Sequence, residues 1–285
     1  MKSSWYMLPA SPKHKRRFMT LMATSLSGFG SGAASNPKFI DVLTDNSLTT
    51  NLEMCLDAGD ASSYTSGQSW LDVSGNDIDF FRGADGSAAS DDPTFNGSGY
   101  FSADGGDFFR HDTGNAAWMT ALHRDNAVYS GAAWIYHDTG HSSQHLFFAA
   151  TWGNQSNEGI AWTMGTTDKS QITVANGSGS SWAFDQASVS TMGTGWHFVG
   201  LSINEAGGGV SFHYVDGTDD AAFDAAYTSP GTGNATNTYE IWGAGGATLA
   251  PSGARMAVFA FWEGTALTAA NFDTIYAATK GRFGL

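Results

Sequence analysis

The sequence predicts an all-β protein in which two antiparallel sheets pack face to face, and three observations support this. Apolar and polar residues alternate through most of the chain after residue 37, which is the period of a half-buried strand. Clusters of Gly, Ser, Asn and Asp separate these runs, and the chain holds 36 glycines but only 6 prolines. Only one stretch, near the C-terminus, has a helical pattern. These features favour a β-sandwich or jelly roll in one domain, residues 38–285.

The strands are predicted from runs of alternating apolar residues. The eight clearest runs lie at residues 127–137, 145–152, 159–165, 170–176, 196–204, 209–217, 238–244 and 254–264. An earlier run, 52–56, contains Cys55, which is the single cysteine of the chain. We interpret it as a buried thiol, and no intrachain disulfide can form.

A short C-terminal helix is predicted over residues 268–283. Thr268 is the expected N-cap. The residues Phe272, Ile275, Tyr276 and Thr279 fall on one helical face.

The charge of the chain is divided between its two parts. The whole chain carries −14 and the first 37 residues carry +5 without any acid, so residues 38–285 carry −19. Such a body repels nucleic acid and anionic membranes, so neither is an expected partner.

Residues 1–37 are interpreted as a basic N-terminal extended arm for anchoring or assembly. Its basic cluster contains Lys13, Lys15, Arg16 and Arg17. The alternative is a secretory signal cleaved near Ala34. Against this alternative, twelve residues precede the basic cluster, and Thr, Ser and Gly interrupt the apolar stretch that follows it. No stretch reaches the 18 apolar residues of a membrane span, so no membrane insertion is expected.

Four motifs resemble the laminin-G-like, concanavalin A-like jelly rolls of lectins and glucanases. They are a strand of the type W-h-h-h at 196–199 paired with a strand ending in Y-V-D-G at 214–217, the entry segment 56–77, the strand 239–246 and the closing segment 254–284. The resemblance covers most of residues 52–284 and implies a two-sheet jelly roll. Domains of this glycine-rich, cysteine-poor type are similar to those of bacteriophage virion proteins.

Catalysis is not predicted. Retaining glucanases of this fold carry acids in the pattern Glu-x-Asp-x-x-Glu, since the chemistry needs two carboxylates flanking the scissile bond. The nearest match is Asp77-Ile78-Asp79, which lacks the third acid. The spacing of His137, His141 and His145 would suit a metal on a helix, but the surrounding sequence predicts a loop with surface histidines.

Two binding sites are considered, each with a structural alternative. The resemblance suggests a calcium ion at a loop rim, with Asp216, Asp219 and Asp220 as candidate ligands, but a solvated acidic turn is favoured. A second acidic set, Asp72, Asn76, Asp77 and Asp79, offers the same chemistry. A glycan platform could use Trp152, Trp162 and Trp182 with Asn154, although core packing is favoured for the tryptophans.

The resulting functional hypothesis is a non-catalytic virion structural protein, such as a head decoration, tail or fibre component. Residues 1–37 would bind other virion proteins or copies of the chain itself, and the sandwich would face outward and bind host-surface glycans. The main alternative is a secreted or surface lectin-like protein. A diverged glycoside hydrolase is the third hypothesis.

Overall fold

The computed structural model describes residues 36–138, 145–153, 155–165, 167–207, 210–245, 247–248 and 250–285. Nearly all of the expected arm lies outside these residues, including Lys13, Lys15, Arg16 and Arg17. The arm therefore stays a prediction.

Two antiparallel sheets form the described body, with eight strands each. Sheet 1 runs in the order β14 (Thr218–Asp219), β13 (Phe212–Val215), β12 (Gly195–Asn204), β7 (Val128–His137), β18 (Arg255–Glu263), β5 (Tyr100–Ser102) and β4 (Thr94–Asn96), and β1 (Leu52–Asp57) also pairs with β18. Sheet 2 runs in the order β11 (Trp182–Ala187), β10 (Ser170–Asn176), β9 (Glu158–Met164), β8 (His145–Ala149), β15 (Glu240–Ile241), β6 (Phe109–His111), β3 (Phe80–Arg82) and β2 (Ser69–Trp70). A separate ribbon pairs β16 (Gly243–Ala244) with β17 (Ala247–Thr248). The expected two-sheet sandwich is confirmed.

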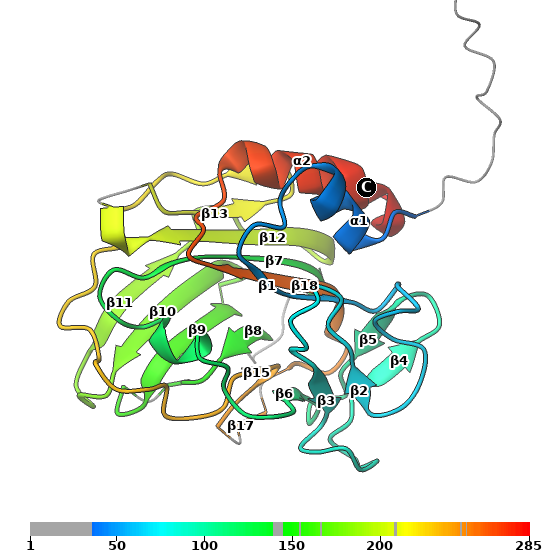
Figure 1. Cartoon of the computed structure of the whole chain (residues 1–285), viewed down its shortest axis with the longest axis horizontal. Coiled ribbons are helices and arrows are strands. Elements are labelled where there is room, and N and C mark those ends of the chain that lie inside the picture. The colour runs from blue at the N-terminus through cyan, green and yellow to red at the C-terminus, as the bar shows by residue number, and fades with distance from the viewer. Residues whose placement is uncertain are drawn as a thin grey trace, which may run out of the picture. The chain divides into compact units, whose positions relative to one another are not determined.

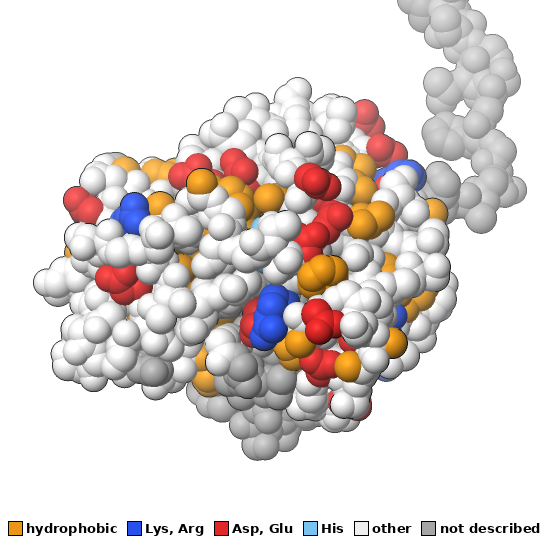
Figure 2. Space-filling model, turned by 60° about the horizontal axis from the view of Figure 1, so that its bottom comes forward, with side chains coloured by type: hydrophobic (Ala, Val, Ile, Leu, Met, Phe, Trp, Pro, Cys, Tyr) orange, Lys and Arg blue, Asp and Glu red, His pale blue; other side chains and the backbone are white. Residues whose placement is uncertain are grey.

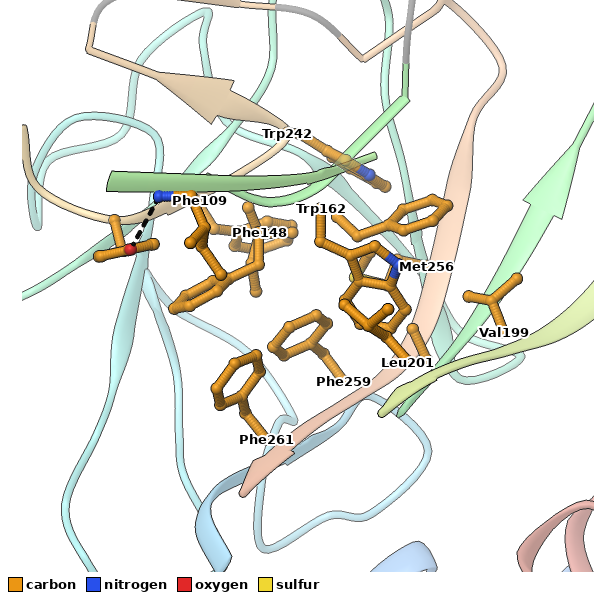
Figure 3. Close-up of a cluster of buried hydrophobic side chains, with 14 of the residues drawn as sticks. Phe109, Phe148, Trp162, Val199, Leu201, Trp242, Met256, Phe259 and Phe261 are labelled. Carbon is orange, nitrogen blue, oxygen red and sulfur yellow. Dashed lines mark hydrogen bonds between the residues drawn. The ribbon is translucent and has the colours of Figure 1, made fainter. Parts of the chain in front are cut away.

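The two sheets face each other and bury one large hydrophobic cluster between them (Figure 1). Strand β12 turns Val199, Leu201 and Ile203 into this cluster, as the alternation of a strand requires. Figure 3 shows aromatic side chains of both sheets meeting there, and the rings of Phe148 and Phe259 lie 5.5 Å apart.

Helices cover the opposite face of sheet 1, which we call its outer face. They are α1 (Phe39–Asp45), α2 (Ala269–Thr279) and the 3₁₀ turn η3 (Lys280–Phe283), and Figure 1 shows α1 and α2 on the same side of β12, β7 and β18. Phe39 and Phe272 are fully buried in the second hydrophobic cluster that forms beneath these helices. Two further 3₁₀ turns are η1 (Met119–Ala121) and η2 (Glu205–Gly207). No helix among the described residues is long and apolar enough to cross a membrane.

Helix α2 follows the sequence prediction. The Thr268 side chain accepts a hydrogen bond from the Asn271 backbone N–H, and the Asn271 side chain accepts one from the Thr268 N–H. This capping box satisfies two N–H groups that the start of a helix leaves unpaired. Phe272, Ile275 and Thr279 are buried, as expected, while Tyr276 is half-buried.

The long strands were predicted to within one residue in five cases, β7, β9, β10, β12 and β18. Three predicted runs were too long, and one of them is 145–152, whose strand ends at Ala149. The run 238–244 is split at Trp242, which has a φ of 67°, and the run 209–217 turns at Asp216, where φ is 49°. Left-handed residues interrupt a ladder because their backbone cannot stay extended.

Candidate functional site

A groove of about 700 Å³ lies on the outer face of sheet 1, next to the start of α1 and to η3. Figure 1 shows the β4–β5 hairpin at the same end of the molecule as α1 and the C-terminus. Five segments that are far apart in sequence line the groove: residues 36–38, 57–65 and 95–100, together with Trp196 and the pair Arg282–Phe283.

The aromatic lining of the groove is centred on Trp196, at the start of β12. Its ring centroid lies 5.4 Å from that of Tyr100 and 4.8 Å from that of Phe283. All three side chains are half-buried, so the groove exposes part of each ring. Phe95, also half-buried, contacts buried Tyr64 with a centroid separation of 4.7 Å. Together these rings give the groove a partly apolar surface.

A buried ion pair fixes the charged wall of the groove. The Arg282 guanidinium donates two hydrogen bonds to the Asp57 carboxylate, at 2.8 and 2.7 Å. The same carboxylate accepts the backbone N–H groups of Phe39 and Gly59. The side chains of Arg282 and Asp57 are only 7% and 1% exposed. These hydrogen bonds offset the free-energy cost of burying two charges. The same bonds connect η3 and α1 to the end of β1.

Two glycines allow the groove segments to approach one another. A Cβ on Gly59 would lie 2.3 Å from Nη2 of Arg282. Gly99 has a φ of 85°, and a Cβ there would lie 2.9 Å from the Cα of Gly59. The β4–β5 hairpin can therefore pack on the loop after β1 only without side chains at this contact.

A second ion pair lies at the mouth of the groove. Nζ of Lys38 is 2.8 Å from the Asp60 carboxylate, and the Lys38 side chain is 47% exposed. The hydrogen bond to Asp60 raises the pKa of Lys38. Burial pushes the pKa of Asp60 upward, but hydrogen bonds from Lys38 and Ser62 outweigh it and leave that pKa lowered. Both groups are therefore charged at neutral pH.

The structure separates the three tryptophans that were considered for a glycan platform, and the favoured core packing is found for Trp162. Trp162 is fully buried between the sheets (Figure 3). Its indole N–H donates to Ser170 Oγ at 3.0 Å. Trp152 is half-buried and packs on the other face of sheet 2, beside Leu146 and Ala149. Trp182 is half-buried at the start of β11, and Asn154 lies outside the described residues. Trp162 cannot contact a ligand because it fills the core.

The three predicted calcium ligands do not form one ligand set. Asp216 accepts hydrogen bonds from the Phe198 N–H and from His197 Nδ1, while Asp219 is exposed. Asp220 is 8% exposed and accepts from Ser190 Oγ and the Val189 N–H. In the described part of the chain, no group of three or more His, Cys, Asp or Glu is placed to hold a metal ion.

The histidines expected on the surface are corrected in two of three cases. His137 is 4% exposed and bonds to Asp168 at 2.9 Å, and His145 is 1% exposed and accepts from the Trp242 indole N–H. His141 lies outside the described residues. His137 and His145 are thus parts of the folded interior.

Comparison with known proteins gives a likeness of structure but not of sequence. No protein-family model matches the chain, and no curated protein sequence matches it. The binding domain of botulinum neurotoxin serotype D is similar with a TM-score of 0.55 at 11% identity, covering 81% of this chain and 52% of that one. The binding domain of botulinum neurotoxin DC, solved in complex with rat synaptotagmin II, gives 0.56 at 12%, covering 81% and 52%. A Trypanosoma rangeli sialidase gives 0.51 at 13%, covering 81% and 33%.

The chain thus spans about half the length of the neurotoxin domains and a third of the sialidase. At these identities the likeness establishes the fold alone. The chain has a two-sheet β-sandwich fold of the kind found in these proteins.

Proposed function

We propose that the protein is a non-catalytic glycan-binding module and that the groove beside Trp196 is its binding site. The observation that carries this proposal is the set of half-buried aromatic rings in an open groove bordered by charged side chains. Apolar faces of sugars pack on aromatic rings, while sugar hydroxyls bond to polar and charged groups at the rim. The groove volume, about 700 Å³, is in the range of small-ligand sites.

The proteins that share the fold support carbohydrate as the class of ligand. They include a botulinum neurotoxin serotype D ligand binding domain in complex with N-acetylneuraminic acid and a Trypanosoma rangeli sialidase in complex with sialic acid. Both extend well beyond the part that matches this chain, so the site must be argued from residues. The resemblance of the sequence motifs to laminin-G-like lectin jelly rolls favours the same class.

Binding without turnover is proposed because the groove carboxylates are already engaged. Asp57 is held by Arg282 and Asp60 by Lys38, and both carboxylates are almost fully buried. A glycosidase needs two accessible carboxylates on either side of the bond it cleaves. Release of reducing sugar from a bound oligosaccharide, abolished by Asp57→Asn or Asp60→Asn, would contradict this part of the proposal.

The binding test uses a panel of neutral and acidic oligosaccharides, followed by isothermal titration of the best binders. Trp196→Ala should weaken binding at least about tenfold, because it removes the central ring of the groove. Trp182→Ala is the matched control, since this half-buried tryptophan does not line the groove. The proposal fails if no panel member binds, or if the control variant loses as much affinity as Trp196→Ala. Thermal unfolding of both variants verifies that they are folded.

A second candidate function is a virion structural role, with the sandwich displayed outward. It is favoured by the division between the basic residues 1–37 and the acidic remainder, which suits attachment to an acidic partner or to other copies. Density-gradient fractionation of the native source, with mass spectrometry of the N-terminal peptide, tests it. Co-migration with large particles is expected, and recovery as a small protein that begins near Ser35 would favour a secreted lectin instead.

A further inference from the structure

The basic side chains of the body are few, and most are held by oxygen atoms of the protein. Residues 36–285 contain eight Lys and Arg. Five of them donate to carboxylates or backbone carbonyls: Lys38, Arg82, Arg110, Arg124 and Arg282. Such pairing is expected where a body carries a net charge of −19. The remaining three, Lys169, Arg255 and Lys280, donate to neither kind of oxygen among the described residues and are the exceptions, and Arg255 is the arginine among them.

Arg255, at the start of β18, is such an exception. Its guanidinium carbon lies 4.4 Å from the ring centroid of Tyr136 and 5.1 Å from that of Tyr100. Among the described residues no carboxylate is within ion-pair distance of it, and the residues outside that set include no Asp or Glu. The side chain is half-buried, so its charge is partly removed from water and stabilised by the tyrosine rings instead.

The position of Arg255 connects it to the groove. Tyr100 both lines the groove and stacks with Arg255. Trp196 contacts Tyr100 and also Tyr136, with ring centroids 5.4 and 5.8 Å apart. Arg255 therefore contacts a side chain of the groove lining, and only the ring of Tyr100 separates it from the groove. Nη1 of Arg255 donates to the Tyr100 hydroxyl over 3.5 Å, and the other N–H groups of the guanidinium fork match the geometry in which a planar carboxylate is bound through two hydrogen bonds.

We propose that Arg255 is an anion subsite beside the groove and that the preferred glycan carries a carboxylate. This inference rests on the glycan-binding function proposed above and specifies its ligand class. The aromatic groove binds the sugar ring, and Arg255 binds the carboxylate of that ring or of its neighbour. Elsewhere the acidic surface repels an anionic sugar, as the numerous acidic and few basic side chains in Figure 2 illustrate, so the subsite also fixes the orientation of the glycan.

The test compares matched pairs of probes that differ in the carboxylate. Sialyllactose is compared with lactose, and trigalacturonate with its methyl ester, by isothermal titration at constant ionic strength. The wild-type protein should bind at least one acidic member about tenfold or more tightly than its neutral partner, as a charge-assisted hydrogen bond provides. Arg255→Gln should abolish this preference and leave the affinity for the neutral member almost unchanged. The two pairs distinguish a sialic acid from a uronic acid as the source of the carboxylate.

Arg124→Gln is the control, because its guanidinium binds the Gly233 carbonyl and lies outside the groove lining. It should keep the preference. Equal binding of acidic and neutral partners by the wild type, or an unchanged preference in Arg255→Gln, would overturn the inference while leaving glycan binding intact. Absence of binding to all probes and to the wider panel would instead defeat the proposed function. If Arg255→Gln does not fold, Arg255→Met replaces it as a second neutral side chain of similar length, and an undiminished preference in that variant overturns the subsite.

Discussion

Replacing Asp57 by alanine tests the role of the buried ion pair at the groove wall. The change removes both acceptors of the Arg282 guanidinium and leaves the N–H groups of Phe39 and Gly59 without their partner. Breaking a buried pair on one side costs about 3–5 kcal/mol, because the remaining charge stays buried and uncompensated. For a domain of this size, such a loss lowers the melting temperature by about 6–20 °C.

Urea denaturation measures this loss as a change in the free energy of unfolding. Lys38→Ala is the control, because its side chain is 47% exposed, so water can replace the ammonium while the Ser62 N–H still donates to Asp60, and the loss should be much smaller than in Asp57→Ala. The double variant Asp57→Leu with Arg282→Met should regain part of the stability, since neither charge is then left buried alone. A loss below about 1 kcal/mol in Asp57→Ala would refute the reasoning, because the carboxylate would then be replaceable by water.

Two further predictions concern a buried carboxyl group and a glycine. Burial raises the pKa of Asp107 from 3.8 to about 6. Between these pH values the folded protein holds a proton on Asp107 that the unfolded chain has lost. The free energy of unfolding therefore falls as the pH rises through this range. Asp107→Asn should raise the free energy of unfolding at pH 7 by about 1–3 kcal/mol, with the gain vanishing near pH 4, and identical pH profiles for both proteins would contradict this. Gly99→Ala should destabilise the protein by more than about 1 kcal/mol, because φ is positive and the Cβ would meet Gly59. Gly97→Ala, where nothing lies within 4 Å, is its control, and equal melting temperatures would refute the steric argument.

The long strands could be predicted because they are apolar runs bounded by turn residues, although β7 and β18 are buried on both faces, one against sheet 2 and the other against the helices. The short strands β2 to β6 have two or three residues each, too few to show a period. Helix α1 was missed because it has seven residues and its N-cap, Lys38, makes no side-chain capping bond. Its buried residues Phe39, Val42 and Leu43 do have helical spacing, which is the signal that could have revealed it.

The site was harder to predict than the fold because tryptophans of the core and tryptophans of the groove both occur in apolar strand segments. Trp162 lies in the middle of β9 and fills the core, whereas Trp196 is the second residue of β12 and lies half-buried beside η3. Position along the strand was the available clue. The partners of Trp196 could not be found from sequence, since Tyr100 and Phe283 are brought to it only by sheet order and by η3.

The dispersed origin of the groove walls has a consequence for the energetics of binding. Asp57 lies at the end of β1, Trp196 at the start of β12 and Arg282 in η3, so the groove exists only when strands and helices distant in sequence have all assembled. Recovery of ligand binding during refolding should therefore report the last long-range step rather than the formation of any local hairpin. Conversely, a ligand that contacts all these segments binds only the fully folded sandwich and so opposes its cooperative unfolding. At a free ligand concentration of a hundred times its Kd, it would raise the free energy of unfolding by about 2.7 kcal/mol.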